Sequence, residues 1–268
     1  MQMKTRVISA AVLIAVTLLC VFASPVTRVL YFALAGGLCA YEYSKNVEKL
    51  EARCTLWVMF LYLAGQAGLT LSRTGLFWYA VWLVFCLYTA LFSGVLHVRV
   101  SGKGALFTLA GLTYPCVLFG ILMIISVSEI WAETLGLAAL ATWSCDAFAL
   151  FGGSRFGKHK LAPHVSPNKT VEGALCGAAA SVAAGALCWF LSRYLHPIPL
   201  GLCLVTALVA STMGQIGDLA ESLMKRMIGV KDFSNLIPGH GGMFDRADSL
   251  LFSIPTTYFC LVIAGFSV

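Results

Sequence analysis

The feature that most constrains this chain is a series of long apolar segments separated only by short polar intervals. A membrane-spanning helix needs about 20 mostly apolar residues, and nine segments of roughly that length can be delimited. Only 11% of the residues are charged and the mean hydropathy is +0.87, whereas a soluble domain carries about 25% charged residues. The sequence therefore predicts an all-α, polytopic membrane helix bundle without a separate soluble catalytic domain. The candidate spans cover residues 7–24, 26–41, 54–71, 76–98, 104–127, 129–152, 171–195, 199–224 and 246–267.

The distribution of Lys and Arg predicts the orientation of the bundle. If the N-terminus is cytoplasmic and all nine spans exist, 15 of the 18 basic residues lie inside and only Arg28, Arg73 and Arg193 lie outside. Cytoplasmic loops carry an excess of Lys and Arg, so this asymmetry favours an N-in, C-out topology with an odd number of spans. The inside residues are Lys4, Arg6, Lys45, Lys49, Arg53, Arg99, Lys103, Arg155, Lys158, Lys160, Lys169, Lys225, Arg226, Lys231 and Arg246.

The ten cysteines and the net charge of +6 indicate neither a disulfide framework nor nucleic-acid binding. The cysteines stand singly, mostly inside apolar runs, without CxxC or Cys/His metal spacing, and are interpreted as small buried hydrophobes. The basic residues lie in loops between spans, so no nucleic acid is expected as a partner. Lys4 and Arg6 before the first apolar run are also compatible with a signal peptide.

The chain divides into two expected regions. Residues 1–128 contain about five spans with almost no charge inside their apolar runs, and we interpret them as a packing scaffold. Residues 129–268 contain the other spans and form the expected catalytic region, with cytoplasmic loops at 153–170 and 225–245 that are rich in Gly, Lys, Arg and Pro. No internal or inverted repeat is visible, which counts against a secondary transporter.

Four carboxylates are expected inside or at the cytoplasmic ends of the C-terminal spans, and a fifth lies just before the last span. A charge near the bilayer centre costs about 2.5–3.5 kcal/mol on insertion scales, so such residues need a reason. Two of the five are three residues apart at the start of the ninth span and therefore share a face. Converging carboxylates suit a hard cation such as magnesium, although a cation pathway or salt-bridged helix ends would place them similarly. The five are Asp146, Asp218, Glu221, Asp245 and Asp248.

The eighth span also carries a polar stripe. Its polar residues are separated by 4, 3, 4 and 3 positions, which places them on one face of a helix with 3.6 residues per turn. We therefore expect this face to line the same site as the carboxylates. The stripe consists of Ser211, Gln215, Asp218, Ser222 and Lys225.

The first basic loop begins with a glycine-rich segment that predicts anion binding. Residues 152–158 follow the G-x4-G-K pattern and resemble a phosphate-binding P-loop, although His159 stands where Ser or Thr is required and a membrane helix precedes the segment. Glycines let backbone N–H groups approach an anion, and Lys158 and Lys160 follow at once. The same lysines also satisfy the positive-inside rule without any further role.

The end of this loop has the pattern of a helix start. Ser166 is expected as the N-cap and Pro167 in the first turn. A helix N-terminus beside Lys169 is a favourable anion site. This segment therefore supplies a second candidate phosphate contact.

The second basic loop carries a 27-residue pattern with many defining positions. These positions are Ser222, Lys225, Arg226, Lys231, Asp232, Pro238, Gly239, His240, Gly241, Gly242, Asp245, Arg246 and Asp248. The pattern closely resembles the motif of the phosphatidate cytidylyltransferases, the CDP-diacylglycerol synthases. The stretch from Asp146 to Gly173 resembles the same family, so the resemblance covers roughly 146–252. Ala247 and Leu150 differ from the residues usual at their positions.

The resemblance implies that CTP and phosphatidic acid are converted to CDP-diacylglycerol and pyrophosphate in phospholipid biosynthesis. A phosphate monoester has a second pKa of about 6 and is largely dianionic near neutral pH, so it can attack the α-phosphorus of CTP without a strong general base. This agrees with the absence of a Ser/His/Asp or Cys/His arrangement in the sequence. The difficulty lies in bringing two anions together, which metal bridging and Lys/Arg clamps achieve.

Roles for individual residues follow from the same resemblance. The residues expected to be catalytic are Asp218, Asp245, Lys225 and Arg246. Magnesium is expected on Asp218 and Asp245, supported by Asp146, Glu221 and Asp248, and a second, monovalent cation is a further expectation. The residues expected to bind substrate are Lys158, Lys160, Ser166, Lys169, Ser222, Arg226, Lys231, His240, Gly241 and Gly242. The expected partners are CTP, phosphatidic acid, the lipid bilayer and a second copy of the chain. The expected location is the inner (plasma) membrane, with the site facing the cytoplasm.

Other functions predict different features. A CDP-alcohol phosphotransferase would carry a D-G-x2-A-R…G-x3-D-x3-D pattern, which is absent from the sequence. A CTP-dependent polyprenol-type lipid kinase would use a similar ligand set and is the nearest enzymatic alternative. A cation transporter would place charges along several helices through the membrane, whereas here the polar residues gather at one face.

Overall fold

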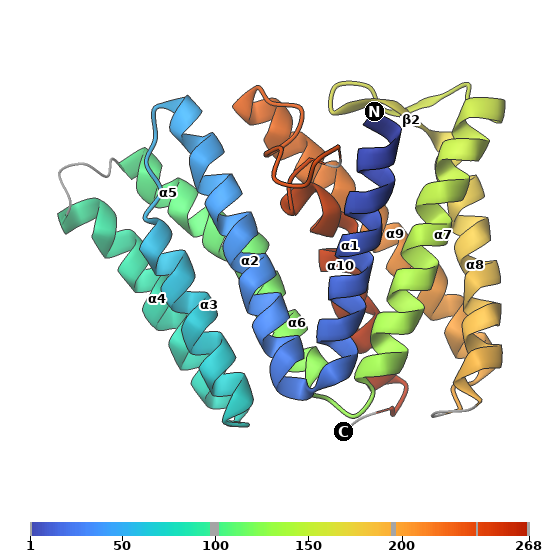
Figure 1. The fold of residues 1–268 in the computed structure, drawn as a ribbon, viewed down its shortest axis with the longest axis horizontal. Helices are drawn as coiled ribbons and strands as arrows, with labels where there is room; N and C mark the ends of the chain where they lie inside the picture. Colours follow the sequence, from blue (N-terminus) through green and yellow to red (C-terminus); the bar gives the residue numbers. More distant parts are fainter. Residues whose placement is uncertain (1, 97–101, 194–196, 240, 267–268) are drawn as a thin grey trace. The chain divides into compact units, whose positions relative to one another are not determined.

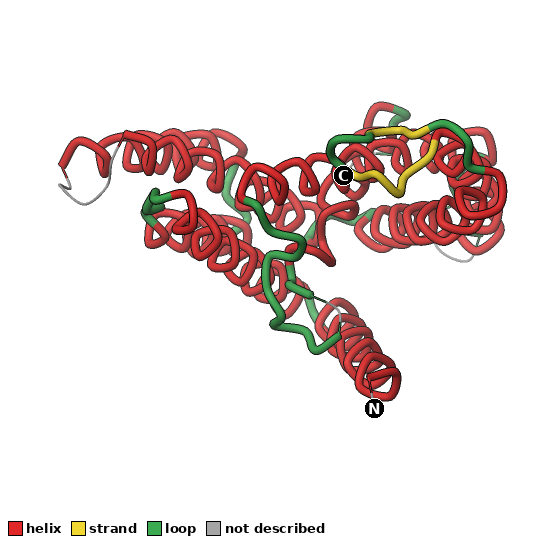
Figure 2. The backbone as a smooth tube through the Cα atoms, turned by 90° about the horizontal axis from the view of Figure 1, so that it is seen from above, coloured by secondary structure: helices red, strands yellow, loops and turns green. Residues whose placement is uncertain are grey.

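The computed structural model describes residues 2–96, 102–193, 197–239 and 241–266 (Figure 1). These residues form helices throughout, apart from one short antiparallel hairpin and the connecting loops (Figure 2). The chain separates into two compact units. The first comprises Met1–Val127 and Ile228–Arg246, and the second comprises Ser128–Met227 and Ala247–Val268. The predicted all-α class is confirmed.

The helices of the first unit begin and end at recognisable sequence signals. Ser24 caps the second helix, because its hydroxyl accepts the Thr27 N–H at 3.1 Å and Pro25 occupies the first helical position. Pro115 lacks an N–H and interrupts the span predicted at 104–127. The elements are α1 (Gln2–Ala23), α2 (Pro25–Val47), η1 (Glu48–Leu50), α3 (Leu56–Leu71), α4 (Leu76–Leu96), α5 (Gly102–Gly111), η2 (Leu112–Val117) and α6 (Leu118–Ser126).

The second unit is built around two helices that pack along their length, α7 and α8 (Figure 1). Glycines permit this close approach: a Cβ at Gly173 would lie 2.7 Å from the Ala149 carbonyl oxygen, and one at Gly177 would lie 2.7 Å from that of Cys145. The elements are α7 (Trp131–Phe156), β1 (Lys160–Ala162), β2 (Ser166–Thr170), α8 (Val171–Ser192), α9 (Leu200–Ile228) and α10 (Phe244–Ile263), the last of which starts in the first unit.

Five helical segments are long and apolar enough to cross a membrane within the described residues. They are Leu76–Val95, Gly102–Ser126, Trp131–Phe156, Val171–Ser192 and Leu200–Ile228, and shorter apolar helices cover Ile8–Ala23 and Leu56–Leu71. Their length and composition are those of a helical membrane protein. The exact number of spans and their orientation stay predictions.

One predicted helix start is wrong. Ser166 and Pro167 lie in strand β2, which pairs antiparallel with β1 in the register Lys160↔Thr170 and Ala162↔Ser166. Helix α8 begins at Val171, where the Thr170 hydroxyl accepts the Gly173 N–H at 3.1 Å. Ser166 and Thr170 are both suitable caps, and the hairpin holds the chain extended as far as Thr170.

The P-loop-like interpretation of residues 152–158 is also wrong. Helix α7 continues to Phe156, so Gly152 and Gly153 belong to its last turn instead of a phosphate-binding turn. A Cβ at Gly152 would lie 2.5 Å from Cys176 Cβ. These glycines therefore serve the packing of α7 against α8 and the hairpin.

Candidate active site

The polar stripe predicted on α9 faces the other elements of its unit. The Ser211 hydroxyl donates to that of Ser181 on α8 at 2.8 Å, and the Gln215 side-chain amide donates to Cys145 Sγ on α7 at 3.1 Å. These contacts join three apolar helices through polar side chains. The 3.6-residue periodicity thus correctly identified the inward face of α9.

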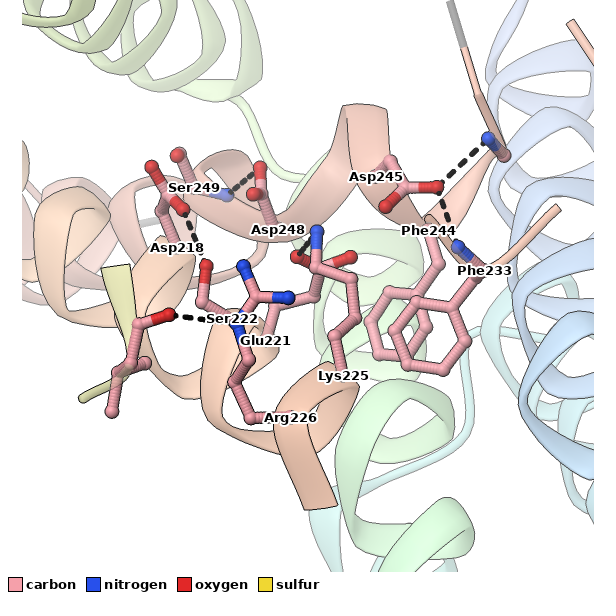
Figure 3. A network of polar contacts seen from close by, with 12 residues as sticks. Asp218, Glu221, Ser222, Lys225, Arg226, Phe233, Phe244, Asp245, Asp248 and Ser249 are labelled. Carbon is pink, nitrogen blue, oxygen red and sulfur yellow. Dashed lines mark hydrogen bonds and ion pairs between the residues drawn. The ribbon is translucent and has the colours of Figure 1, made fainter. Parts of the chain in front are cut away.

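Asp218 lies at the centre of the charged part of this unit. Its Oδ2 is 2.5 Å from Lys169 Nζ on β2. Ser222, one turn further along α9, donates to its Oδ1 at 3.4 Å (Figure 3). The negative charges of Asp146 and Asp248 both interact with that of Asp218. Three of the five predicted carboxylates therefore share one electrostatic environment with a lysine from the hairpin.

The end of α9 supplies two further cations. Lys225 forms an ion pair with Glu221, one turn earlier, and Glu221 is completely buried (Figure 3). Arg226 Nε donates to the Val165 carbonyl oxygen at 3.1 Å, which ties α9 to the hairpin. A buried carboxylate is costly without a partner, so Glu221 and Lys225 are best understood as a mutually neutralising pair.

The hairpin loop is held by a carboxylate that the sequence analysis did not select. Glu172, in the first turn of α8, accepts the Lys158 N–H at 3.0 Å and the His159 N–H at 3.1 Å, and its Oε1 lies 2.6 Å from His159 Nδ1. The backbone donors expected to receive an anion thus already bind one, which belongs to the chain itself. Lys158 and Lys160 remain exposed beside it.

Asp245 is organised by the loop before α10, within the first unit. Its Oδ2 accepts the Phe233 N–H at 3.0 Å and the Gly242 N–H at 2.8 Å, and the residue is 8% exposed (Figure 3). Gly239 and Gly241 have φ angles of +79° and +85°, which L-residues rarely adopt, so this turn requires glycine. The Asp245 carboxylate thereby joins Phe233 to Gly242 and fixes the base of this loop.

Glu42 on α2 is a second buried carboxylate at this loop, and the sequence analysis did not select it. It is 3% exposed and accepts hydrogen bonds from the Ser234 hydroxyl at 2.6 Å and from the Met243 and Phe244 N–H groups, both at 2.9 Å. Its partners lie about 200 residues further along the chain, so no local pattern could have revealed it. An acidic residue directly after the second predicted span, 26–41, is the only signal that the sequence offered.

The remaining predicted residues differ in exposure. Lys231 and Arg246 are exposed, as are Asp146 and Arg226, whereas Ser222 and Gly242 are buried. Ser166, Lys169, Asp218, Lys225, Gly241 and Asp248 are half-buried. His240 lies outside the described residues.

The donors around Asp218 fit magnesium in their chemistry. Hard oxygen ligands suit Mg²⁺, which typically binds through one or two carboxylates together with water and substrate phosphates. No group of three or more His, Cys, Asp or Glu side chains in the described part of the chain is close enough to hold a metal ion. A site in which Asp218 and one neighbouring carboxylate supply the protein ligands agrees with both facts.

The comparisons with known proteins give this site its family. The fold is that of a helical membrane protein, with a charged cluster where apolar helices meet the hairpin. The sequence model of the Cytidylyltransferase family matches residues 4–264, and the chain belongs to this family.

Individual relatives cover different shares of the chain. It is 35% identical over 258 residues to the phosphatidate cytidylyltransferase of Brucella abortus biovar 1 (strain 9-941), covering 96% of this chain and 92% of that relative. It is 44% identical over 126 residues to the enzyme of that name from Bacillus subtilis (strain 168), where the match spans less than half of each chain, 47% and 46% respectively. A Staphylococcus saprophyticus relative of the same name is 36% identical over 164 residues, or 61% of this chain and 62% of its own.

Proposed function

We propose that this protein transfers the cytidylyl group of CTP to phosphatidic acid, giving CDP-diacylglycerol and pyrophosphate. The observation that carries the proposal is the cluster of Asp218, Lys169, Asp146 and Asp248, which concentrates opposite charges where apolar helices meet the β1–β2 hairpin. A water-soluble nucleotide and a lipid headgroup can meet there. Family membership and the names of the relatives agree with this reaction.

The basic residues around the cluster would bring the two anionic substrates together. Lys169 from the hairpin and Arg226 from α9 would bind phosphate groups by charge-assisted hydrogen bonds, and so would Lys225 if it exchanged its Glu221 partner for a phosphate; their contacts to Asp218, Val165 and Glu221 support this proposal. Each is oriented by a contact within the chain, which lowers the ordering cost on binding. Lys158, Lys160, Lys231 and Arg246 would raise the local concentration of anions, as clusters of one charge sign do.

The transfer itself needs no nucleophilic side chain. A phosphate oxygen of the lipid forms a bond to the α-phosphorus of CTP while the bond from that phosphorus to its bridging oxygen breaks, and pyrophosphate leaves. The monoester is already largely dianionic near neutral pH because its second pKa is about 6. The chain therefore acts by positioning and by charge stabilisation.

We propose magnesium as the cofactor, held by Asp218 with Asp146 or Asp248. When bound, it would neutralise phosphate charge and stabilise the leaving pyrophosphate. The assignment of Asp245 to magnesium rests on the motif alone, as does the second, monovalent cation. The ion pair of Asp218 with the Lys169 ammonium supports a preference of this carboxylate for cations.

We also propose a membrane, an orientation and an assembly for this protein. An N-in, C-out arrangement in the inner (plasma) membrane would expose both basic loops to the cytoplasm, where CTP is found. A homodimer is the proposed assembly. The charge asymmetry of the loops supports the orientation, and the dimer stays a sequence-based prediction.

Labelled CTP tests the proposed reaction. Purified protein is incubated with phosphatidic acid, magnesium and CTP labelled at either the α- or the γ-phosphate. Cytidylyl transfer places the α-label in the lipid and releases the γ-label as pyrophosphate. A polyprenol-type kinase would transfer the γ-label to a lipid and release CDP, and a transporter would leave both labels in CTP; either result would refute the proposal.

A further inference from the structure

Glu42 does not belong to the family motif, but it contacts the loop in which part of that motif lies. Helix α2 places this carboxylate so that three donors converge on it: the Ser234 hydroxyl, the Met243 N–H and the Phe244 N–H. Burying a carboxylate costs several kcal/mol unless it is well hydrogen-bonded, so packing alone does not explain a 3% exposed glutamate here. The contacts indicate a specific task at the loop.

Glu42 and Asp245 hold the same two stretches of chain. Asp245 accepts the N–H groups of Phe233 and Gly242, and Glu42 accepts donors from the residues directly after each of these, Ser234 and Met243. The two carboxylates thus close the loop of residues 235–241 at its base. Within it, the Ile237 N–H donates to the Gly241 carbonyl oxygen at 2.9 Å.

The neighbouring residues are shaped for this contact. A Cβ at Gly242 would lie 2.6 Å from Glu42 Oε2, so a larger residue there would displace the carboxylate from its present position. One turn further along α2, Asn46 Nδ2 donates to the Phe233 carbonyl oxygen at 2.6 Å and to that of Glu42 at 2.8 Å. Helix α2 therefore binds the base of the loop through two side chains, Glu42 and Asn46, that lie one turn apart.

The negative charge of Glu42, and not only the shape of its side chain, stabilises the start of α10. Met243 and Phe244 lie at the start of α10, where unpaired N–H groups carry partial positive charge that a carboxylate stabilises. A glutamine of the same size offers one acceptor oxygen, and its NH₂ group would face a donor. The Glu42→Gln substitution therefore removes the charge and one backbone contact while conserving side-chain volume.

We propose that Glu42 is a positioning residue that fixes the base of this loop, residues 233–234 and 242–244, and, through the orientation of Asp245, the affinity for magnesium-bound CTP. This inference rests on the proposed function, because the ligand of the loop is taken to be CTP. It gives the region 1–128, expected from sequence to be only a scaffold, an indirect influence on substrate affinity through this loop.

The test compares kinetic constants and amide exchange in Glu42→Gln. We expect the KM for CTP to rise about tenfold, the scale set by one hydrogen bond to a charged group, with the KM for phosphatidic acid unchanged. Without any substrate, hydrogen exchange should accelerate at residues 233–244 and stay unchanged in α7 and α8. Ser234→Ala, which removes one donor to Glu42 together with the acceptor of the Leu236 N–H, should raise the KM for CTP by about threefold and serves if the first variant does not fold.

Glu133→Gln is the matched control, because Glu133 is a similarly buried glutamate at 5% exposure in the other unit. It should leave the KM for CTP unchanged. The inference is overturned if Ser234→Ala and any folded Glu42→Gln keep the wild-type KM for CTP and wild-type exchange at 233–244, or if Glu133→Gln raises that KM equally. Failure of the proposed function is distinguishable, since the wild type itself would then transfer no cytidylyl group, while the exchange result would still report on the loop.

Discussion

At the scale of single residues, Asp218 has the most demanding environment. It forms an ion pair with Lys169 and accepts a weak hydrogen bond from Ser222. Asp146 and Asp248 lie close enough for their carboxylates to interact electrostatically with it. Like charges at one site repel unless a cation compensates them. Lys169 compensates Asp218 and Lys225 acts on Asp248, so two lysines face three carboxylates and a bound cation would compensate the third.

The Asp218→Asn substitution should therefore abolish most activity without unfolding the protein. We expect turnover to fall by at least ~10²-fold, the scale seen when one preorganised charge stabiliser is removed. Insertion into the membrane should survive, because losing a charge lowers the cost of burial. Steady-state turnover, measured alongside the amount of protein in the membrane fraction, gives both quantities.

Glu51→Gln provides the comparison, since Glu51 is exposed in the loop between α2 and α3. It should retain activity close to wild type, and so should Glu48→Gln. Similar losses in all three variants would indicate general destabilisation and would remove the support for a metal site at Asp218.

Sequence alone revealed some of these residues and missed others for a physical reason. The 4-3-4-3 spacing on α9 is a local pattern, so the inward direction of Asp218 and Ser222 could be predicted from helix geometry. Glu42 binds residues that are 192, 201 and 202 positions away. Such pairing depends on the tertiary fold, and a single charge in an apolar run does not name its partner.

At the scale of secondary-structure elements, the sequence predicts that the apolar segments are helices. It does not predict the structure of the loop between α7 and α8. Apolar runs of about 20 residues indicate spanning helices without further information. Both Ser166 and Thr170 are good caps, so local sequence could not decide where α8 starts. The pairing of β1 with β2 decides it, together with the Glu172 carboxylate that binds the backbone of Lys158.

The packing of α7 against α8 leads to a stability prediction. Gly177→Ala places a methyl group 2.7 Å from the Cys145 carbonyl oxygen, so the helices must separate. We expect a loss of about 1–3 kcal/mol, as for other overpacked interiors. A lower thermal midpoint of the detergent-purified protein would report it.

Gly136→Ala is the corresponding control on α7, because a Cβ there meets no atom within 4 Å. Alanine is favoured over glycine inside a helix by about 1 kcal/mol, so this variant should be neutral or slightly more stable. If Gly177→Ala has the same thermal midpoint as Gly136→Ala, the close contact between α7 and α8 does not determine the stability of this unit.

At the scale of the whole molecule, the sequence-based topology has a direct test. Fifteen of the 18 Lys and Arg residues lie on one side when nine spans are counted from a cytoplasmic N-terminus, and the positive-inside rule makes that side cytoplasmic. A reporter that is active only in the cytoplasm, fused after Val268, should therefore be silent, whereas the same reporter inserted between Pro163 and His164 in the hairpin loop should be active. An active C-terminal fusion would mean that the span count is wrong by one. A silent hairpin fusion in a stably expressed protein would mean that Lys158, Lys160 and Lys169 lie on the side of the membrane without CTP. The hairpin could then not bind the nucleotide, which would contradict the proposed reaction.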